Sequence, residues 1–273
     1  MKTYKIHLIR HGLTQGNIDG TYVGHKDIPV CEQGIAQLQQ MKRDLIYPEI
    51  PALFCSPLTR CKQTSSVIYP DMEPIIINDL IEYNFGEFEG RSVDELKNNE
   101  EFSAWLSGDA TSAPPFGESN ADFGKRIGNA FEKIVEGLMK TGVTEAGIVT
   151  HGGVIMGIMS MYALPELPMP EWLVPNGCGY TVMITPTLWT HAKKMEVFAE
   201  IPYETARTND SPDADRYFED DGYSFDDFMG DVMNNNLLKF IENSPTAFHT
   251  VENVKAELKA LGFTELYEGL KWN

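Results

Sequence analysis

Three short apolar runs in this chain each end in a polar or glycine-containing turn, and this repetition constrains the fold most. The runs are residues 4–9, before Arg10-His11-Gly12; residues 52–54, before Cys55-Ser56-Pro57; and residues 147–150, before His151-Gly152-Gly153. Apolar runs of this length are typical of buried strands. Glycine after a strand lets the backbone turn sharply and approach an anion closely.

Helical patterns alternate with these strands. Apolar residues recur at helical spacing over residues 35–45 and 123–138, and the methionine-rich residues 156–161 are predicted to form a core helix behind His151. Strands that alternate with helices indicate a mainly parallel sheet covered on both faces. We therefore predict an α/β fold, a three-layer α/β/α sandwich with a mainly parallel central sheet.

The remaining elements are expected to be short. Residues 75–77 are predicted as a central strand, and residues 179–185 and 195–198 as a terminal hairpin. Ser56 is expected to cap a helix whose first residue is Pro57. That helix would carry Arg60 on its first turn.

The predicted topology gathers Arg10, His11, Arg60 and His151 at one edge of the sheet. Ligands of open α/β sheets bind beyond the carboxyl ends of the strands. An imidazole beside guanidinium groups suits attack on a phosphoryl group, because the imidazole is a nucleophile and the arginines neutralise phosphate charge. An Arg-His pair alone is weak support for such a site, because these residues are common on solvated surfaces.

Five ordered stretches, one of which contains the Arg-His pair, turn this weak signal into a resemblance. The chain resembles the histidine phosphatase superfamily, in its phosphoglycerate-mutase-like branch, over roughly residues 1–200. The matching stretches are residues 8–17 with 27–29, residues 56–64, residues 80–90, residues 117–119 with Arg126, and residues 149–153. The resemblance implies an α/β enzyme that works through a phosphohistidine.

The resemblance also implies a role for each matching position. His11 is implied as the phosphorylated nucleophile, and Glu82 as the carboxyl that protonates the leaving oxygen and then deprotonates water. The implied phosphoryl clamp is Arg10, Arg60 and His151, with Asn17 as a neutral donor and Thr14, Gly24 and Gly152 as further substrate contacts. His11 must be neutral at the attacking nitrogen, so its other nitrogen is expected to donate to a backbone carbonyl. We expect no cofactor and no metal ion, because the arginines and histidines supply the positive charge.

Several of these residues have a second interpretation. Without the motifs, Glu82, Glu87 and Glu89 form an ordinary solvated acidic turn. With the motifs, Glu82 is favoured as the acid over Glu87 and Glu89. The histidines outside the motifs are interpreted as surface or packing residues: His7, His25, His191 and His249.

The segment between the glutamate motif and residue 117 bears on the reaction. Phosphoglycerate mutases of this superfamily carry a long basic lid there, which retains the bisphosphate intermediate. Residues 91–116 are mostly acidic or neutral, and Lys97 is their only lysine. This scarcity of cations favours a phosphatase over a mutase, and the Phe85-Gly86-Glu87-Phe88-Glu89-Gly90 pattern resembles small phosphatases such as the α-ribazole phosphatases.

The net charge of −18 limits the expected partners. It argues against nucleic acid and anionic membranes, so we expect a small phosphorylated substrate held in a local cationic site. No apolar run reaches the roughly 18 residues of a spanning helix, and the first residues lead into a strand rather than a signal peptide. The cysteines Cys31, Cys55, Cys61 and Cys178 show no metal-ligand spacing, and we interpret them as reduced thiols in the cytoplasm.

Composition changes after about Pro202. We predict a phosphatase domain over residues 1–202, an acidic linker over 203–235 and a short helical tail over 236–273. Residues 201–235 hold ten acidic and two basic side chains, which is typical of a solvated linker.

The tail resembles the first segment of aspartyl-aminopeptidase-type zinc peptidases, but the zinc-binding motifs of that family have no counterpart here. The tail is therefore either the start of an aminopeptidase in a longer, bifunctional chain or a remnant used for packing, and its end in the middle of a motif favours the first. Partners expected on this basis are a covalently linked aminopeptidase domain or a second copy of the chain. A non-catalytic docking module is a further alternative, against which the intact catalytic residues argue.

Overall fold

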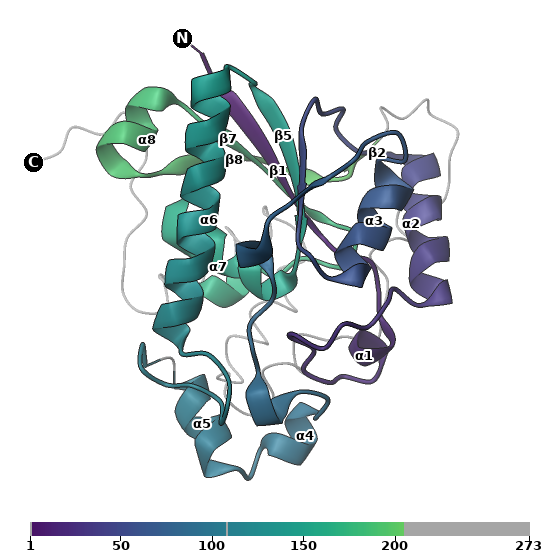
Figure 1. Cartoon of the computed structure of the whole chain (residues 1–273), viewed down its shortest axis with the longest axis vertical. Helices are drawn as coiled ribbons and strands as arrows, with labels where there is room; N and C mark the ends of the chain where they lie inside the picture. Colours follow the sequence, from purple (N-terminus) through teal and green to yellow (C-terminus); the bar gives the residue numbers. More distant parts are fainter. Residues whose placement is uncertain (1, 108, 205–273) are drawn as a thin grey trace, which may run out of the picture. The chain divides into compact units, whose positions relative to one another are not determined.

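The computed structural model describes residues 2–107 and 109–204, which form an α/β unit around one seven-stranded sheet (Figure 1). The strand order is β4-β3-β5-β1-β7-β8-β6. The strands are β1 (Tyr4–Arg10), β3 (Leu53–Cys55), β4 (Ile75–Ile76), β5 (Glu145–Thr150), β6 (Ala163–Leu164), β7 (Gly179–Ile184) and β8 (Met195–Ile201). In the described part of the chain, β7 alone runs against the other strands of this sheet. The predicted α/β fold with a mainly parallel sheet is confirmed.

The two faces of the sheet are buried by different helices. Along β1, Ile6 and Leu8 pack into one core cluster with α6 (Asn120–Thr141) and α7 (Gly152–Tyr162). Ile9 packs into a second cluster with α2 (Glu32–Asp44) and α3 (Thr59–Ile68). Figure 1 shows the two pairs of helices on opposite sides of the sheet. Each fully buried aliphatic side chain contributes about 1.5–3 kcal/mol, so the alternation along β1 holds three layers together.

Helix ends follow local sequence signals. The side chain of Ser119 accepts a hydrogen bond from the amide of Asp122 and caps α6, and Gly142 ends the helix with φ of 77°. Such a left-handed residue favours glycine at a helix C-terminus. The helices predicted over 35–45, 123–138 and 156–161 correspond to α2, α6 and α7 and are confirmed. The predicted antiparallel pair of terminal strands is also confirmed, although α8 (Pro186–Ala192) separates β7 from β8 in place of a tight turn.

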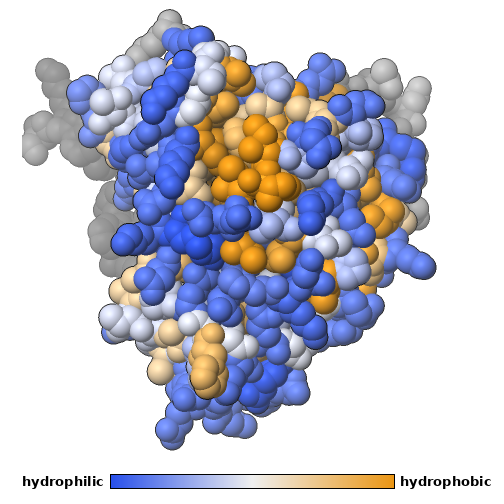
Figure 2. Space-filling view, viewed as in Figure 1, coloured by the Kyte–Doolittle hydropathy of each residue, from blue (hydrophilic) through white to orange (hydrophobic). Residues whose placement is uncertain are grey.

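Two local predictions were wrong. Residues 75 and 76 form β4 at the edge of the sheet, not in its centre, and Ile75 and Ile76 are 53% and 42% exposed. Figure 2 shows an apolar patch on the face of the molecule that is turned to the viewer in Figure 1. The helix after Pro57 begins at Thr59, so Ser56 is not its cap. The side chain of Asp27 instead accepts hydrogen bonds from the amide and hydroxyl of Thr59, which frees Ser56 for another contact.

Irregular segments cover the carboxyl ends of the parallel strands. They include the short helices α1 (Gln15–Ile18), α4 (Val93–Leu96) and α5 (Glu100–Leu106), and the 3₁₀ turns η1 (Asn78–Leu80) and η2 (Gly86–Phe88). A further 3₁₀ turn, η3 (Met169–Trp172), follows β6. An aromatic cluster joins α5 to the segment between η1 and η2; its rings are Tyr22, Tyr83, Phe85, Phe88, Phe102, Trp105 and Phe123.

The predicted boundary at residue 202 needs a small correction. Tyr203 and Glu204, which we placed in the acidic linker, form β9 (Tyr203–Glu204) and pair with β2 (Leu45–Ile46). The rest of the predicted linker and tail, with His249, lies outside the described residues. No helix among the described residues is long and apolar enough to cross a membrane.

Candidate active site

Three neighbouring strands bring a cluster of cationic and imidazole groups together. His11 follows β1, His151 follows β5, and Arg60 lies on the first turn of α3 after β3. The His11 and His151 rings meet edge to face with centroids 5.3 Å apart, and Arg60 Nε donates to His151 Nδ1 at 3.2 Å. All three residues are buried. The structure therefore gathers the predicted nucleophile and two predicted clamp residues at one point.

The ring of His11 is held in a defined tautomer. Its Nδ1 lies 2.8 Å from the carbonyl oxygen of Gly12, and a carbonyl only accepts, so Nδ1 carries the proton. This confirms the expected bond to a backbone carbonyl and leaves the lone pair on Nε2. Burial, with the charges of Arg60 and Arg10, holds the pKa of His11 well below its ordinary value. Both effects keep the ring neutral and nucleophilic.

Arg60 and Arg10 are fixed by backbone carbonyls. Arg60 donates from Nη2 to Gly24 at 2.8 Å and from Nη1 to Lys26 at 3.0 Å, and Arg10 Nη1 donates to Val174 at 2.7 Å. These carbonyl oxygens orient the guanidinium groups and carry no net charge of their own, so the contacts do not neutralise the arginines. The site can therefore attract an anion.

Gly24 and Gly152 occupy tight positions in this cluster. A Cβ atom at position 24 would lie 2.0 Å from the carbonyl oxygen of Tyr83, so only glycine fits there. Gly152 begins α7, and a Cβ atom at that position would lie 3.3 Å from Arg10 Nε. The partial positive charge of this helix end adds to that of the arginines.

Ser56 contacts the second imidazole. Its hydroxyl lies 2.7 Å from His151 Nε2, while His151 Nδ1 accepts from Arg60. With Nδ1 acting as the acceptor, Nε2 carries the proton and donates to Ser56. Burial and then the charge of Arg60 hold the pKa of His151 well below its ordinary value, which favours this neutral form.

Asn17 and Thr14 form the cap of α1. Thr14 Oγ1 accepts from the amide of Asn17, and Asn17 Oδ1 accepts from the amide and hydroxyl of Thr14. Asn176 Nδ2 donates to Asn17 Oδ1 at 3.2 Å and to the carbonyl of His11 at 2.9 Å. Because Oδ1 is occupied by donors, the amide nitrogen of Asn17 is its group suited to an incoming oxygen.

Glu82 lies beside the N-terminus of α7. Its carboxylate accepts from the amide of Tyr83 at 2.9 Å and from the amide of Gly153 at 3.0 Å. Burial raises the pKa of Glu82, against the opposing effects of these hydrogen bonds and of Arg60 and Arg10. A buried carboxyl with a raised pKa is suited to carry a proton near neutral pH.

The two competing glutamates differ from Glu82. Glu87 is exposed, and the carboxylate of Glu89 accepts from the amides of His25 and Lys26. Glu89 therefore orders the 23–26 loop. The geometry favours Glu82 as the acid.

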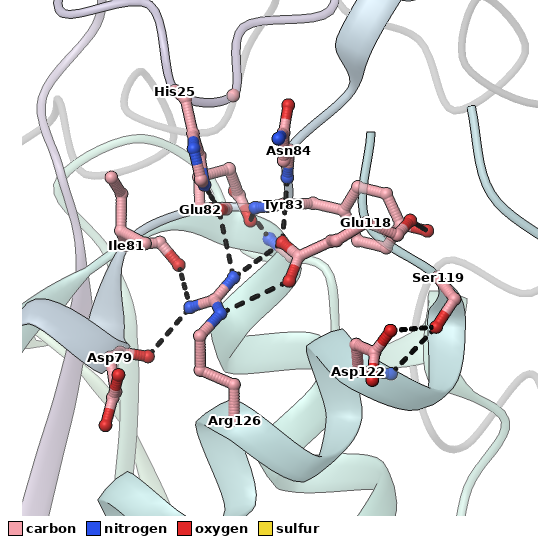
Figure 3. A network of polar contacts seen from close by, with 12 residues as sticks. His25, Asp79, Ile81, Glu82, Tyr83, Asn84, Glu118, Ser119, Asp122 and Arg126 are labelled. Carbon is pink, nitrogen blue, oxygen red and sulfur yellow. Dashed lines mark hydrogen bonds and ion pairs between the residues drawn. The ribbon is translucent and has the colours of Figure 1, made fainter. Parts of the chain in front are cut away.

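Arg126 holds the backbone around Glu82 (Figure 3). From α6 it donates to the carbonyls of Asp79 and Ile81, each at 2.8 Å, and to that of Glu82 at 3.2 Å. Its guanidinium also pairs with the Glu118 carboxylate at 2.6 Å. The motif residues Glu118 and Arg126, to which the sequence assigned no role, thus support the segment that carries the acid.

Other contributors had little sequence signal. Thr64 accepts from the amide of Gly12 and donates to the carbonyl of Arg60, which ties the His11 turn to α3. Asn176 lies far along the chain, and only its Pro-Asn-Gly context marks it as a turn. Contacts to main-chain atoms of this kind cannot be inferred without the fold.

The histidines outside the motifs divide into different environments. His7 is buried between Thr181 and Glu145 and is a packing residue, as interpreted. His191 is exposed. His25 is exposed, as interpreted, but its Nε2 also lies 2.9 Å from the carbonyl oxygen of Glu82.

Residues 2–107 and 109–204 contain free thiols but no cluster of metal ligands. The four cysteines, all within these ranges, form no disulfide. No group of three or more histidine, cysteine, aspartate or glutamate side chains there has the arrangement of a metal site.

Comparisons with known proteins agree on one family. The model of the histidine phosphatase superfamily (branch 1) matches residues 6–196. The adenosylcobalamin/α-ribazole phosphatase of Escherichia coli is 31% identical over 185 residues, which cover 66% of this chain and 90% of the relative. A 2,3-bisphosphoglycerate-dependent phosphoglycerate mutase of Bifidobacterium longum is 26% identical and covers 58% of this chain and 77% of the relative. The crystal structure of the α-ribazole phosphatase from Shigella flexneri superposes with a TM-score of 0.60 at 28% identity, over 71% of this chain and 95% of that one.

Proposed function

The chain belongs to the histidine phosphatase superfamily, and we propose that it hydrolyses a phosphomonoester of a small metabolite through phosphorylated His11. It is an enzyme of phosphohistidine-mediated phosphoryl hydrolysis or transfer. The observation that carries the proposal is the buried cluster of neutral His11, Arg60 and His151 beside a buried carboxyl with a raised pKa.

In the first step, His11 Nε2 attacks phosphorus. The N–P bond forms as the P–O bond to the leaving group breaks, and protonated Glu82 gives its proton to the leaving oxygen. Arg10, Arg60 and His151 stabilise the charge on the phosphoryl oxygens, with the Asn17 amide as a neutral donor. Electrostatic stabilisation of this kind is usually the largest contribution to the rate.

In the second step, water attacks the phosphohistidine. Glu82, now ionised, takes a proton from the water as the O–P bond forms, and the N–P bond breaks to return the lone pair to His11 Nε2. Acid-base assistance of this kind typically contributes about a hundredfold to ten-thousandfold in rate. Inorganic phosphate leaves, and Glu82 is protonated again for the next cycle.

Hydrolysis is favoured over mutase activity by the lid. Of the lid's cations, Lys97 pairs with Asp94 at 2.9 Å, and Arg91 donates to the carbonyl of Glu95. Acidic residues outnumber cations in residues 91–116, so the lid is poorly suited to retain a bisphosphate. The likeness to α-ribazole phosphatases supports the same conclusion and makes α-ribazole 5′-phosphate the first substrate to assay, in a panel with phosphoserine and phosphoglycerate.

The nucleophile is tested by rapid quench with ³²P-labelled substrate. Wild-type protein should trap acid-labile phosphate, and His11→Ala should neither trap phosphate nor turn over any phosphomonoester. Turnover that survives in His11→Ala would overturn the mechanism. Production of a phosphate isomer from phosphoglycerate, instead of free phosphate, would assign the protein to the mutases.

Metal independence is a second expectation. The guanidinium groups of Arg10 and Arg60 supply positive charge and donors at the phosphoryl oxygens, so turnover should not depend on added divalent ions. Assays with EDTA and with added Mg²⁺ or Zn²⁺ should give the same kcat/KM. Inactivation by EDTA that is reversed by one metal would contradict this expectation.

For residues 205–273 the proposal is an acidic linker followed by an aminopeptidase-like segment that carries no zinc ligands. Full-length protein with added zinc should therefore release no amino acid from aspartyl-p-nitroanilide. We propose two alternative partners for this region. One is an aminopeptidase domain covalently linked in a longer, bifunctional polypeptide, and the other is a second copy of the chain. The reduced thiols support a cytoplasmic location.

A further inference from the structure

The imidazole of His25 contacts the main chain of the proposed acid. Nε2 lies 2.9 Å from the carbonyl oxygen of Glu82, and because a carbonyl only accepts, Nε2 carries the donated proton. The same oxygen accepts from Arg126 Nη2 at 3.2 Å. Figure 3 shows His25 and Arg126 approaching the Glu82 main chain from different elements.

The loop that carries His25 is fixed on two sides. Glu89 accepts from the amides of His25 and Lys26, while Arg60 donates to the carbonyls of Gly24 and Lys26. The 23–26 loop therefore contacts the arginine of the phosphoryl clamp. Through His25, it also contacts the residue that carries the acid.

The carboxyl of Glu82 has its own attachment to the clamp. Its oxygens accept from the amides of Tyr83 and Gly153, and Gly153 follows directly after His151 and Gly152. The acid is thus tied to the clamp by its carboxylate through α7 and by its main chain through His25. Proton transfer requires heavy atoms within about 2.6–3.2 Å, so the main-chain attachment bears on the reaction.

We propose that His25 is a positioning residue that holds the carboxyl of the acid Glu82 in place relative to the phosphoryl clamp. This proposal rests on the proposed function, because it takes Glu82 as the acid. His25 itself touches no reacting atom. Its loss leaves Arg126 as the remaining side-chain donor seen at the Glu82 carbonyl and lets the carboxyl shift relative to the leaving oxygen.

A positioning role predicts a loss that depends on the leaving group. p-Nitrophenolate leaves without a proton, whereas an alkoxide does not. His25→Ala should lower kcat/KM for an alkyl phosphate about tenfold, a part of the acid's own contribution. It should change kcat/KM for p-nitrophenyl phosphate less than about twofold. His25→Gln, whose terminal amide offers a donor at a similar reach, should recover most of the alkyl phosphate activity.

The matched control is His191→Ala, which removes an exposed histidine from α8. This variant should leave kcat/KM unchanged for both the alkyl phosphate and p-nitrophenyl phosphate. Melting temperatures of all variants separate positioning from unfolding, because His25 is exposed and its loss should not lower the melting temperature by more than a few degrees.

A double-mutant cycle completes the test. In a Glu82→Gln background, His25→Ala should cause no further selective loss with the alkyl phosphate, because the group that it positions is gone. Equal losses for both substrates, no loss at all, or full additivity with Glu82→Gln would each overturn the proposal.

The Glu82→Gln variant alone separates this proposal from the proposed function. If Glu82→Gln is itself unselective, the acid lies elsewhere, and the assignment of Glu82 falls together with the role of His25, while the phosphohistidine mechanism is tested separately by His11→Ala. If Glu82→Gln is selective and His25→Ala is not, only the positioning role of His25 falls.

Discussion

The two halves of the site are built in different ways. The clamp half, with His11, Arg60 and His151, stands at the ends of adjacent parallel strands and is buried by the sheet and α3. The acid half, residues 78–90, contains no strand and consists of short 3₁₀ turns and extended backbone. Its shape depends on side chains from elsewhere that bind its main chain, chiefly Arg126 and His25.

The two halves are sensitive to different substitutions. Strand register fixes the clamp, so its geometry follows from the core. The acid half is held by polar tethers and by the aromatic cluster around Trp105, whose Nε1 donates to the Tyr83 hydroxyl at 3.0 Å. Substitutions in the clamp should therefore affect all substrates, and substitutions in the tethers should affect mainly substrates that need a proton.

The sharpest comparison is between two arginines that both bind carbonyls. Arg60→Lys removes a planar donor beside the proposed phosphoryl position, so kcat/KM should fall about a hundredfold to a thousandfold for every phosphomonoester. Arg126→Lys lies behind Glu82 and should lower activity on alkyl phosphates more than on p-nitrophenyl phosphate. Steady-state kinetics with both substrates would measure the two patterns.

If Arg60→Lys caused the selective loss and Arg126→Lys the uniform loss, the distinction between the two halves would be wrong. Glu118→Gln is the control for Arg126, because it weakens the 2.6 Å ion pair but leaves the three carbonyl contacts of Arg126 in place. It should reproduce the selective loss in a weaker form.

The acid half alone should set the alkaline side of the pH profile. The pKa of His11 is lowered, so the nucleophile stays neutral well into acid, and the pKa of Glu82 is raised, so the acid stays protonated above its ordinary range. For an alkyl phosphate, kcat/KM should rise with pH through the pKa of His11 and fall with pH through that of Glu82. Glu82→Gln should lose about a hundredfold with this substrate and abolish the fall.

With p-nitrophenyl phosphate the same variant should lose far less in kcat/KM. This quantity reports only steps up to the first irreversible one, so the later role of Glu82 as a base does not enter. Equal losses for the two substrates, or an alkaline fall that persists in Glu82→Gln, would move the acid to another residue.

The clamp half could be predicted from the sequence more directly than the acid half. His11, Arg60 and His151 could be placed because they directly follow apolar runs or open a helix, and parallel strands bring such positions together. Glu82 rested on resemblance, since an acidic turn by itself gives no sign of burial. The roles of Ser56, Asn176 and His25 could not be predicted, because each depends on a contact with a residue more than fifty positions away.

The same distinction explains the errors. Ser56 has the local signature of a helix cap, but Asp27 takes that position through a long-range contact and Ser56 bonds His151 instead. Residues 75–77 are apolar enough for a central strand, yet among the described residues only β3 pairs with β4. Local sequence patterns predict whether a segment is a helix or a strand. Contacts with residues distant in sequence decide whether a strand lies at the edge of the sheet, which residue caps a helix and which groups a side chain binds.

The support beneath the clamp can be weakened without touching the acid half. The hydroxyl groups of Tyr203 and Thr181 form a hydrogen bond of 2.7 Å, in which either oxygen can be the donor. Thr181 lies opposite His7 of β1. A chain ending at Glu204 should melt like the full protein. A chain ending at Pro202 should stay folded and active but lose about 2 kcal/mol, from one hydrogen bond and a partly buried ring.

That loss corresponds to a melting temperature lower by roughly 4–8 °C for a domain of this size. The ratio of kcat/KM for alkyl and p-nitrophenyl phosphates should be unchanged in both truncated chains, because neither change reaches residues 78–90. An altered ratio would show that the two halves are coupled through the sheet. Loss of the transition in the chain that ends at Glu204 would show that residues 205–273 are structural.

The smallest effect is expected from backbone strain beside the acid half. Phe116 is 87% exposed and has φ of 59°, in a turn closed by the amide of Gly117 and the carbonyl of Pro114. A side chain in this conformation costs about 1–2 kcal/mol, and the extra freedom of glycine in the unfolded chain costs about 0.5–1 kcal/mol. Phe116→Gly should therefore stabilise the protein by about 0–1.5 kcal/mol, or up to roughly 6 °C in melting temperature. Phe116→Ala is the matched control: it removes the ring but keeps Cβ, so it should give no gain.

Since the turn packs against residues 84–87 through the Glu87 amide and the Pro115 carbonyl, a lower melting temperature for Phe116→Gly would show that the exposed ring stabilises the acid half. Equal falls in kcat/KM for both variants at unchanged stability would instead assign the ring to substrate binding.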